Sequence, residues 1–201
     1  MKRITAFLLI GGLWVVQACN NSMKTNTRTD SNANTTQDTT SMSNNANSSD
    51  TSSTVSGPVG KDVADFTAKA ASGGMMEVQL GQIAQTKAMD PRIKAFGSMM
   101  VQDHSTANDE LKRLADAKHI NLPGTLSAGE QDKINDMNKK TGKDFDKAYM
   151  KMMIDDHKKD VKEFEKAGND LTDPDLKNFA MKTLPTLQKH LDSAKAITNN
   201  K

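Results

Sequence analysis

The sequence has few aromatic residues, a single cysteine and almost no excess of charge. Phe, Trp and Tyr make up 4% of the 201 residues, so core volume must come mainly from Leu, Ile, Val and the 13 Met residues. Cys19 is the only cysteine, which excludes a disulfide within the chain. The net charge is +2, from 27 basic and 25 acidic residues. This balance argues against a nucleic-acid-binding protein, which would carry a basic face to neutralise phosphates.

Motifs of several enzyme classes are missing as well. The sequence contains no Gly-rich phosphate loop, no His-Glu-x-x-His pair and no serine in a nucleophile elbow. No segment alternates apolar and polar residues as a strand would. The sequence therefore favours no particular enzyme activity, and a metal oxidase is the weakest of the functions considered.

The first 19 residues have the pattern of a lipoprotein signal peptide. A basic start at Lys2 and Arg3 precedes an apolar run from Ile4 to Val16 that is too short to span a bilayer as a helix. Cys19 follows this run directly, which predicts lipidation of its thiol; ordinary cleavage after Ala18 is the alternative. Acylation would anchor the protein to a membrane, and we expect a periplasmic location at the outer membrane of a Gram-negative bacterium.

Residues 20–60 consist almost entirely of Asn, Ser, Thr and Asp. Such a composition buries too little apolar surface to offset the entropy of ordering, so it predicts a disordered tether. About 40 flexible residues have a root-mean-square span of roughly 35 Å, enough to hold a folded part clear of a lipid surface. From Lys61 the pattern becomes helical, and residues 61–201 are predicted to form one helical domain.

Four long segments of this domain place apolar residues on one helical face. The first begins at Lys61, and the second and fourth begin at the Asp-Pro pairs that start at Asp90 and Asp173. The third runs from about 144 to 167, and a short polar helix from 127 to about 138 precedes it. We therefore predict an all-α fold, an antiparallel up-and-down four-helix bundle with a short extra helix between its second and third long helices.

Each long segment carries one potential metal ligand on its apolar face, and these are Glu77, His104, His157 and His190. His104 and His157 end two near-copies of one pattern, Met-aliphatic-x-Asp-His. Glu77 and His104 lie 13 and 14 residues from Asp90, so an antiparallel pair brings them to one level. His157 lies about 11 residues before Gly168, where we expect the third helix to end, and His190 lies 16 after Pro174. That leaves a mismatch of several Å unless a kink at Pro185 changes the register.

One carboxylate and three imidazoles in a bundle core would suit iron, copper or zinc. Met100 and Met153 lie one turn before two of the histidines, and thioether beside imidazole favours copper. Asp103 and Asp156 could orient the histidines or bind an edge metal. The alternative is a structural or interaction module of the cell envelope without a metal, in which methionines fill the core and the four polar side chains form a hydrogen-bonded network.

Several ordered motifs resemble a known family. They are Ala70-Ala71-Ser72-Gly73-Gly74-Met75-Met76-Glu77-Val78, Met100-Val101-Gln102-Asp103-His104, Ala148-Tyr149-Met150 with Asp156-His157, and Lys182-Thr183-Leu184-Pro185-Thr186-Leu187 with His190. Over about residues 62–198 the chain is similar to the ferritin-like bacterial envelope proteins grouped as domain-of-unknown-function family 4142. The resemblance implies an exported ferritin-like four-helix bundle of unsettled activity. The residues three before the histidines are Val101, Ile154 and Leu187, so the chain departs from the Glu-x-x-His pattern of di-iron members.

Overall fold

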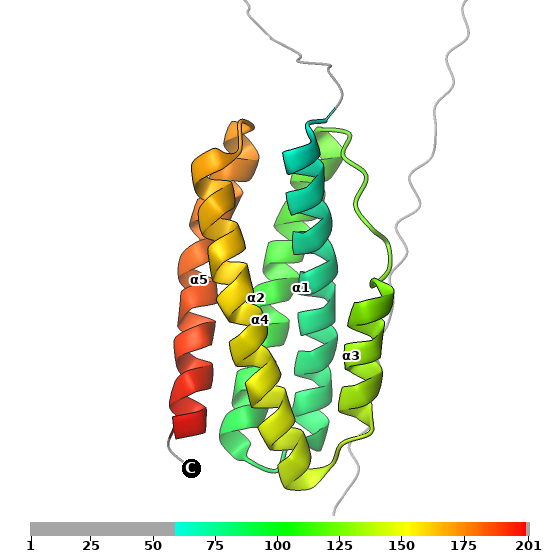
Figure 1. Cartoon of the computed structure of the whole chain (residues 1–201), viewed down its shortest axis with the longest axis vertical. Coiled ribbons are helices and arrows are strands. Elements are labelled where there is room, and N and C mark those ends of the chain that lie inside the picture. Colours follow the sequence, from blue (N-terminus) through cyan, green and yellow to red (C-terminus); the bar gives the residue numbers. More distant parts are fainter. Residues whose placement is uncertain (1–58, 200–201) are drawn as a thin grey trace, which may run out of the picture. The chain divides into compact units, whose positions relative to one another are not determined.

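The computed structural model describes residues 59–199, which contain five helices and no strand. These are α1 (Lys61–Lys87), α2 (Pro91–Ala117), α3 (Ala128–Asn138), α4 (Gly142–Asp170) and α5 (Pro174–Asn199) (Figure 1). The prediction of an all-α chain is confirmed for this part of the protein. The predicted signal peptide with Cys19 lies outside the described residues, as does the predicted tether up to residue 58.

Helices α2, α3 and α5 begin at residues whose side chains cap the helix. The Asp90 carboxylate accepts a hydrogen bond from the backbone N–H of Arg92, with Pro91 at the first helical position of α2. Ser127 and Glu130 form a capping box at the start of α3. Asp173 accepts hydrogen bonds from the backbone N–H groups of Asp175 and Leu176 at the start of α5. Local side-chain chemistry therefore explains these three helix starts.

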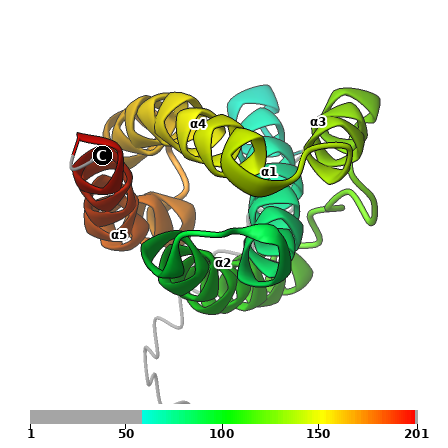
Figure 2. The ribbon, with the colours of Figure 1, turned by 90° about the horizontal axis from the view of Figure 1, so that it is seen from below.

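The four long helices enclose a common core, and α3 lies outside it against α1. Seen end-on, their order around the core is α1, α2, α5 and α4 (Figure 2). Each neighbouring pair in this ring is antiparallel, as Lys69 with Glu163 and Met89 with Asp146 illustrate for α1 and α4. Within residues 59–199 no helix combines the length and the apolar character that a membrane span requires.

The connection between α2 and α4 differs from the predicted up-and-down order. Residues 118–141, which include α3, run back along α1, so α4 starts at the same end as α2 and runs parallel to it (Figure 1). Ser72 near the middle of α1 contacts Glu130 at the start of α3, and Lys87 at the end of α1 contacts the carbonyl of Asn138. The up-and-down prediction was wrong here because it assumed short connections throughout.

The core is divided into two apolar clusters with polar residues between them. One cluster contains Leu80, Met100 and Met153, and the other contains Leu111, Phe164 and their neighbours. The buried polar side chains between these clusters are Glu77, His104, His157 and His190. We call these four residues the polar layer.

Two glycines bring α1 and α2 close together at one level of the bundle. A Cβ atom at Gly81 would lie 2.7 Å from the backbone oxygen of Gly97, and a Cβ at Gly97 would lie 2.8 Å from that of Gly81. Both contacts involve backbone, so no side-chain movement could relieve them. This close approach positions Glu77 and His104, which lie about one to two turns away along the two helices.

The sequence predicted that α4 ends at Gly168, and this prediction was wrong. The helix continues to Asp170, and Gly168 is buried against α5, where a Cβ would lie 2.9 Å from Cγ of Met181. The longer α4 places His157 13 residues before the helix end, which reduces the predicted mismatch with His190. Helix α5 continues through Pro185.

Candidate metal centre

The polar layer brings together one side chain from each long helix. Glu77 comes from α1, His104 from α2, His157 from α4 and His190 from α5. All four are buried, and His157 and His190 have no exposed surface. One ring nitrogen from each histidine lies within 4.8 Å of one from each of the other two. The structure thus brings all four predicted residues to one level, including His190.

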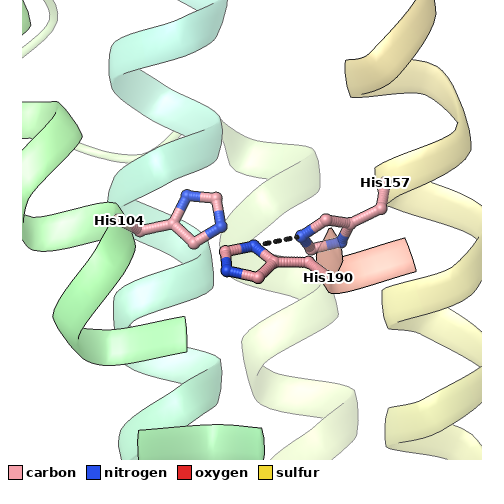
Figure 3. A group of neighbouring side chains, drawn as sticks. All are labelled: His104, His157 and His190. Carbon is pink, nitrogen blue, oxygen red and sulfur yellow. Dashed lines mark hydrogen bonds between the residues drawn. The ribbon is translucent and has the colours of Figure 1, made fainter. Parts of the chain in front are cut away.

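His157 and His190 face each other through two ring nitrogens (Figure 3). The distance from Nε2 of His157 to Nδ1 of His190 is 3.2 Å. The other nitrogen of each ring must donate a hydrogen bond, because Nδ1 of His157 meets the carbonyl oxygen of Met153 at 2.9 Å and Nε2 of His190 meets a carboxylate oxygen of Asp103 at 2.9 Å. In neutral rings the two facing nitrogens are therefore both acceptors. Only a proton or another cation between them makes this contact favourable.

His104 completes the group with a nitrogen that has no partner. Its Nδ1 lies 3.0 Å from Oε2 of Glu77, whereas its Nε2 is buried without a hydrogen bond. Figure 3 shows this ring with one nitrogen turned toward the rings of His157 and His190. A buried acceptor without a partner is costly unless a ligand satisfies it.

Burial makes a proton a poor occupant of this group. Desolvation lowers the pKa of His104, His157 and His190 below the ordinary value for histidine, and lowers that of His157 to about 4. Repulsion from a neighbouring imidazolium lowers the pKa of His104 and His157 further. Near neutral pH the three rings are neutral and able to act as metal ligands.

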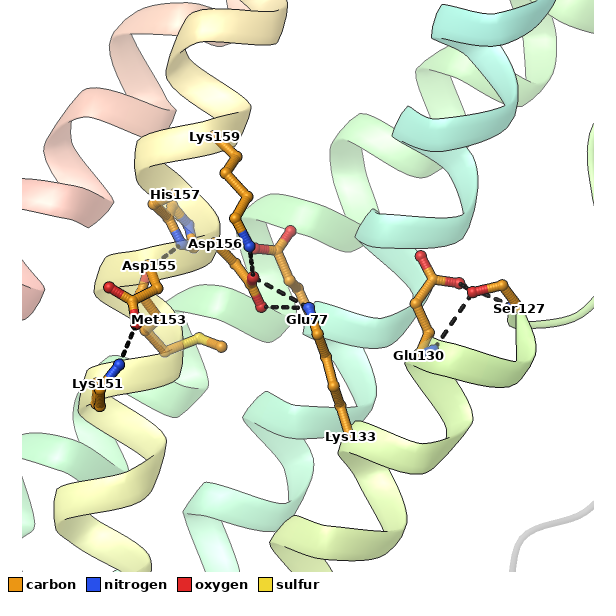
Figure 4. A network of polar contacts seen from close by, with 10 residues as sticks. All are labelled: Glu77, Ser127, Glu130, Lys133, Lys151, Met153, Asp155, Asp156, His157 and Lys159. Atoms are coloured by element: carbon orange, nitrogen blue, oxygen red, sulfur yellow. Dashed lines mark hydrogen bonds and ion pairs between the residues drawn. The ribbon is translucent and has the colours of Figure 1, made fainter.

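Two aspartates were predicted to support the histidines, and the structure gives them different contacts. Asp103 accepts the hydrogen bond from His190 described above. Asp156 instead accepts two hydrogen bonds of 3.0 Å from Lys133 of α3 and one of 3.3 Å from Lys159 (Figure 4). Asp156 therefore connects α3 to α4, while Asp103 connects α2 to α5.

Sequence reasoning missed Asp160, which forms a second potential metal group with Glu77 and His157. Asp160 lies three residues after His157, almost one turn along the same helix. Desolvation, together with repulsion by Asp156 and Glu163, raises the pKa of its carboxyl group to about 7. The spacing of three residues from His157 could have pointed to Asp160, but Asp160 does not lie on the predicted apolar face of the helix.

Three buried polar side-chain atoms within residues 59–199 lack a hydrogen bond, and all belong to this region. They are Oε1 of Glu77, Nε2 of His104 and the phenol oxygen of Tyr149. Tyr149 is close enough to Glu77 for that carboxylate to raise the pKa of its phenol, although burial is the larger cause. Native proteins leave few buried polar atoms unpaired, and a ligand bound here could satisfy these three.

Three further polar residues of the long helices and their ends lie outside the centre. Glu110 accepts hydrogen bonds from Lys182, and Glu163 lies 3.4 Å from Lys69. His119 is exposed just after α2, with a positive φ of 56°.

Residues 29–197 match the family described as Domain of unknown function (DUF4142). No curated protein and no solved structure matched the chain. The family match covers well over half of the 201 residues and includes all five helices up to Ile197 of α5. The chain therefore belongs to the DUF4142 family.

Proposed function

We propose that the protein binds a divalent first-row transition metal in the core of its helical bundle. The ligands are the three inward nitrogens, Nε2 of His104, Nε2 of His157 and Nδ1 of His190. The observation that carries this proposal is the 3.2 Å contact between two ring nitrogens that both act as acceptors. Two ligand nitrogens at about 2.0–2.1 Å from a tetrahedral ion are about 3.3 Å apart, so the observed separation suits a shared metal.

The outer nitrogens of the rings support the same assignment. Metal-bound histidines usually donate their second N–H to a carboxylate or a backbone carbonyl, which fixes the ring and its tautomer. His104 has Glu77 in this position, His157 has the carbonyl of Met153, and His190 has Asp103. In this arrangement Glu77 orients His104 and does not itself bind the ion held by the histidines.

The donor set favours zinc, copper or iron over magnesium and calcium, because imidazole suits the first group and oxygen ligands suit the second. Three protein ligands leave a fourth position free. The buried thioethers of Met100 and Met153, one turn before their histidines, keep copper in the range of ions to test.

We further propose a ferritin-like arrangement of the bundle and a location at the cell envelope. The long connection between α2 and α4 supports the first point, because ferritin-like bundles have one such crossover. Sequence alone supports the second, through the apolar run that ends before Cys19. A Cys19→Ala variant should no longer partition into detergent; continued partitioning would exclude the acyl anchor.

Metal analysis of the purified full-length chain tests the main proposal. After the protein is stripped with a chelator and loaded separately with Zn²⁺, Cu²⁺ and Fe²⁺, we expect one tightly bound ion per chain and a raised melting temperature. Co²⁺ should give the intense visible absorption of a tetrahedral site. Absence of bound metal with all three ions would leave a hydrogen-bonded polar network, and hence a structural module, as the function of these residues.

A pair of matched variants locates the ion. His104→Asn should lower the affinity at least tenfold, because one of three ligands is lost. His119→Asn makes the same change at an exposed histidine, where asparagine tolerates the positive φ, and should bind as the wild type does. Equal affinities of the two variants would place the ion elsewhere.

A further inference from the structure

Beside the histidines, the buried Glu77 and the half-buried Asp160 have carboxylate oxygens that the proposed three-histidine site does not use. Oε1 of Glu77 is buried without a hydrogen bond and lies 3.4 Å from Nδ1 of His157, which already donates to Met153. Asp160 projects from α4 into the same region, and ligand atoms of Glu77, His157 and Asp160 all lie within 4.8 Å of one another. The carboxylates of Glu77 and Asp160 are close enough to repel each other when both are ionised.

No basic side chain within residues 59–199 forms an ion pair with Asp160, and the ion-pair partners of Glu77 are His104 and His157. Lys133, which lines the same region, directs its ammonium group to Asp156. A divalent cation would supply the two positive charges that this pair lacks.

The surroundings offer space and a route for such an ion. A cavity of about 30 Å³ touches Glu77, His104 and Asp160, which is room for about one water molecule or ion. On the outer side a pocket of about 190 Å³ is lined by the same two carboxyl groups and by Asp156. Its charged lining comprises five acidic and three basic side chains, and the three lysines pair with Asp156 and Glu163 and not with Glu77 or Asp160. Figure 4 shows Lys133 and Lys159 at this face, both directed toward Asp156.

We propose that Glu77 and Asp160 hold a second divalent cation, adjacent to the three-histidine ion and of the class that prefers oxygen ligands, such as Mn²⁺ or Mg²⁺. Water from the outer pocket completes its coordination. This inference rests on the proposed function, because Glu77 then lies between the two ions, with Oε2 orienting His104 and Oε1 facing the second cation. The protein would thus contain a two-metal centre, in which histidine nitrogens bind one ion and carboxylate oxygens bind the other.

Stoichiometry separates this inference from the proposed function. The full-length chain, stripped of metal, is supplied with one equivalent of Zn²⁺ and then with excess Mn²⁺, passed through a desalting column and analysed for both elements. We expect one Zn²⁺ and one Mn²⁺ per chain. One Zn²⁺ without Mn²⁺ would overturn the second site and leave the first. Absence of Zn²⁺ would overturn the proposed function, whether or not Mn²⁺ remains.

The Asp160→Asn variant identifies the oxygen site. It should keep Zn²⁺ and lose at least tenfold in Mn²⁺ affinity, whereas Asp155→Asn, an exposed aspartate of the same helix, should keep both ions. Retention of Mn²⁺ by Asp160→Asn would overturn the assignment. The wild type provides a test that needs no variant, because Cu²⁺ in the histidine site should broaden the electron paramagnetic resonance signal of adjacent Mn²⁺. An unchanged Mn²⁺ signal would show that the two ions are not neighbours.

Discussion

Asp103 of α2 accepts a hydrogen bond from Nε2 of His190 of α5 over 2.9 Å, which leaves Nδ1 of that ring free to face His157. The carboxylate lies at the edge of the bundle, with 28% of its side chain exposed, and yet it sets the tautomer of a fully buried ring. Asp103 is therefore a positioning residue for the proposed metal site.

Asp103→Asn should weaken metal binding roughly 10- to 100-fold, as the loss of a partner that orients a ligand usually does. The amide is a weaker acceptor and can also offer an N–H group to the ring, which would favour the wrong tautomer. Competition titration with a chromogenic chelator measures the effect. Asp109→Asn, at an exposed position of the same helix, serves as the control. An unchanged affinity in Asp103→Asn would show that His190 needs no help to bind.

Lys133→Met should speed the removal of metal by a chelator while changing stability little. Lys133 holds α3 against α4 through Asp156 and lies at the mouth of the outer pocket, so its loss opens the path to Glu77 and Asp160. Partly exposed ion pairs contribute at most about 1 kcal/mol, so folding should survive. The control is Lys139→Met, which removes an exposed pair with Asp136 on the same helix. Identical release rates in the two variants would exclude α3 as a barrier to the ion.

Gly81→Ala should destabilise the protein by about 1–3 kcal/mol, because the new Cβ would meet backbone of α2 that cannot move aside. Gly73→Ala in the same helix meets nothing within 4 Å and should stabilise by about 0.5–1 kcal/mol through better helix propensity. Urea unfolding of the two variants measures both changes. Equal effects on the free energy of unfolding would mean that the close approach of α1 and α2 at Gly81 does not contribute to stability.

Asp160→Asn should raise the melting temperature of metal-free protein at pH 8 and change it much less at pH 5. The carboxyl group has a pKa of about 7 in the folded protein against an ordinary value of 3.8, so the folded state holds this proton more tightly. Its contribution to stability is full below pH 3.8 and is lost as the pH rises through 7. Asparagine cannot ionise beside Glu77, Asp156 and Glu163 and so avoids that loss.

Thermal scans in excess chelator at the two pH values provide the measurement. Asp155→Asn, whose carboxylate is exposed and paired with Lys151, should show no gain at pH 8. A gain in Asp160→Asn of the same size at both pH values would contradict ionisation of Asp160 as its cause.

Helix positions were accessible from sequence because their signals are local. Asp90 with Pro91, Ser127 with Glu130, and Asp173 with Pro174 each specify a helix start through contacts within a few residues. The direction of α4 in the bundle could not be predicted from the sequence. It depends on the connection of residues 118–141 packing along α1, which involves contacts between residues more than fifty apart, such as Ser72 with Glu130.

The four residues of the polar layer were identified from sequence, but Asp160 was missed and the separate roles of these residues were not predicted. Apolar periodicity placed Glu77 and the three histidines inward, and the counts from Asp90 set the level of His104. Whether a residue faces the ion or orients a ligand depends on which ring nitrogen meets which oxygen, and spacing along a helix does not contain that information. The same holds for Asp156, whose partner Lys133 belongs to a helix outside the bundle core.

The polar layer crosses the full width of the bundle and leaves an apolar cluster on either side of it. Each cluster occupies only part of the bundle's length. The polar layer between them contains the contact between His157 and His190, which is unfavourable without a cation. The cooperativity of unfolding should therefore depend on whether an ion is bound in the polar layer. We therefore expect the two clusters to unfold together when an ion fills the polar layer and to be less tightly coupled without one.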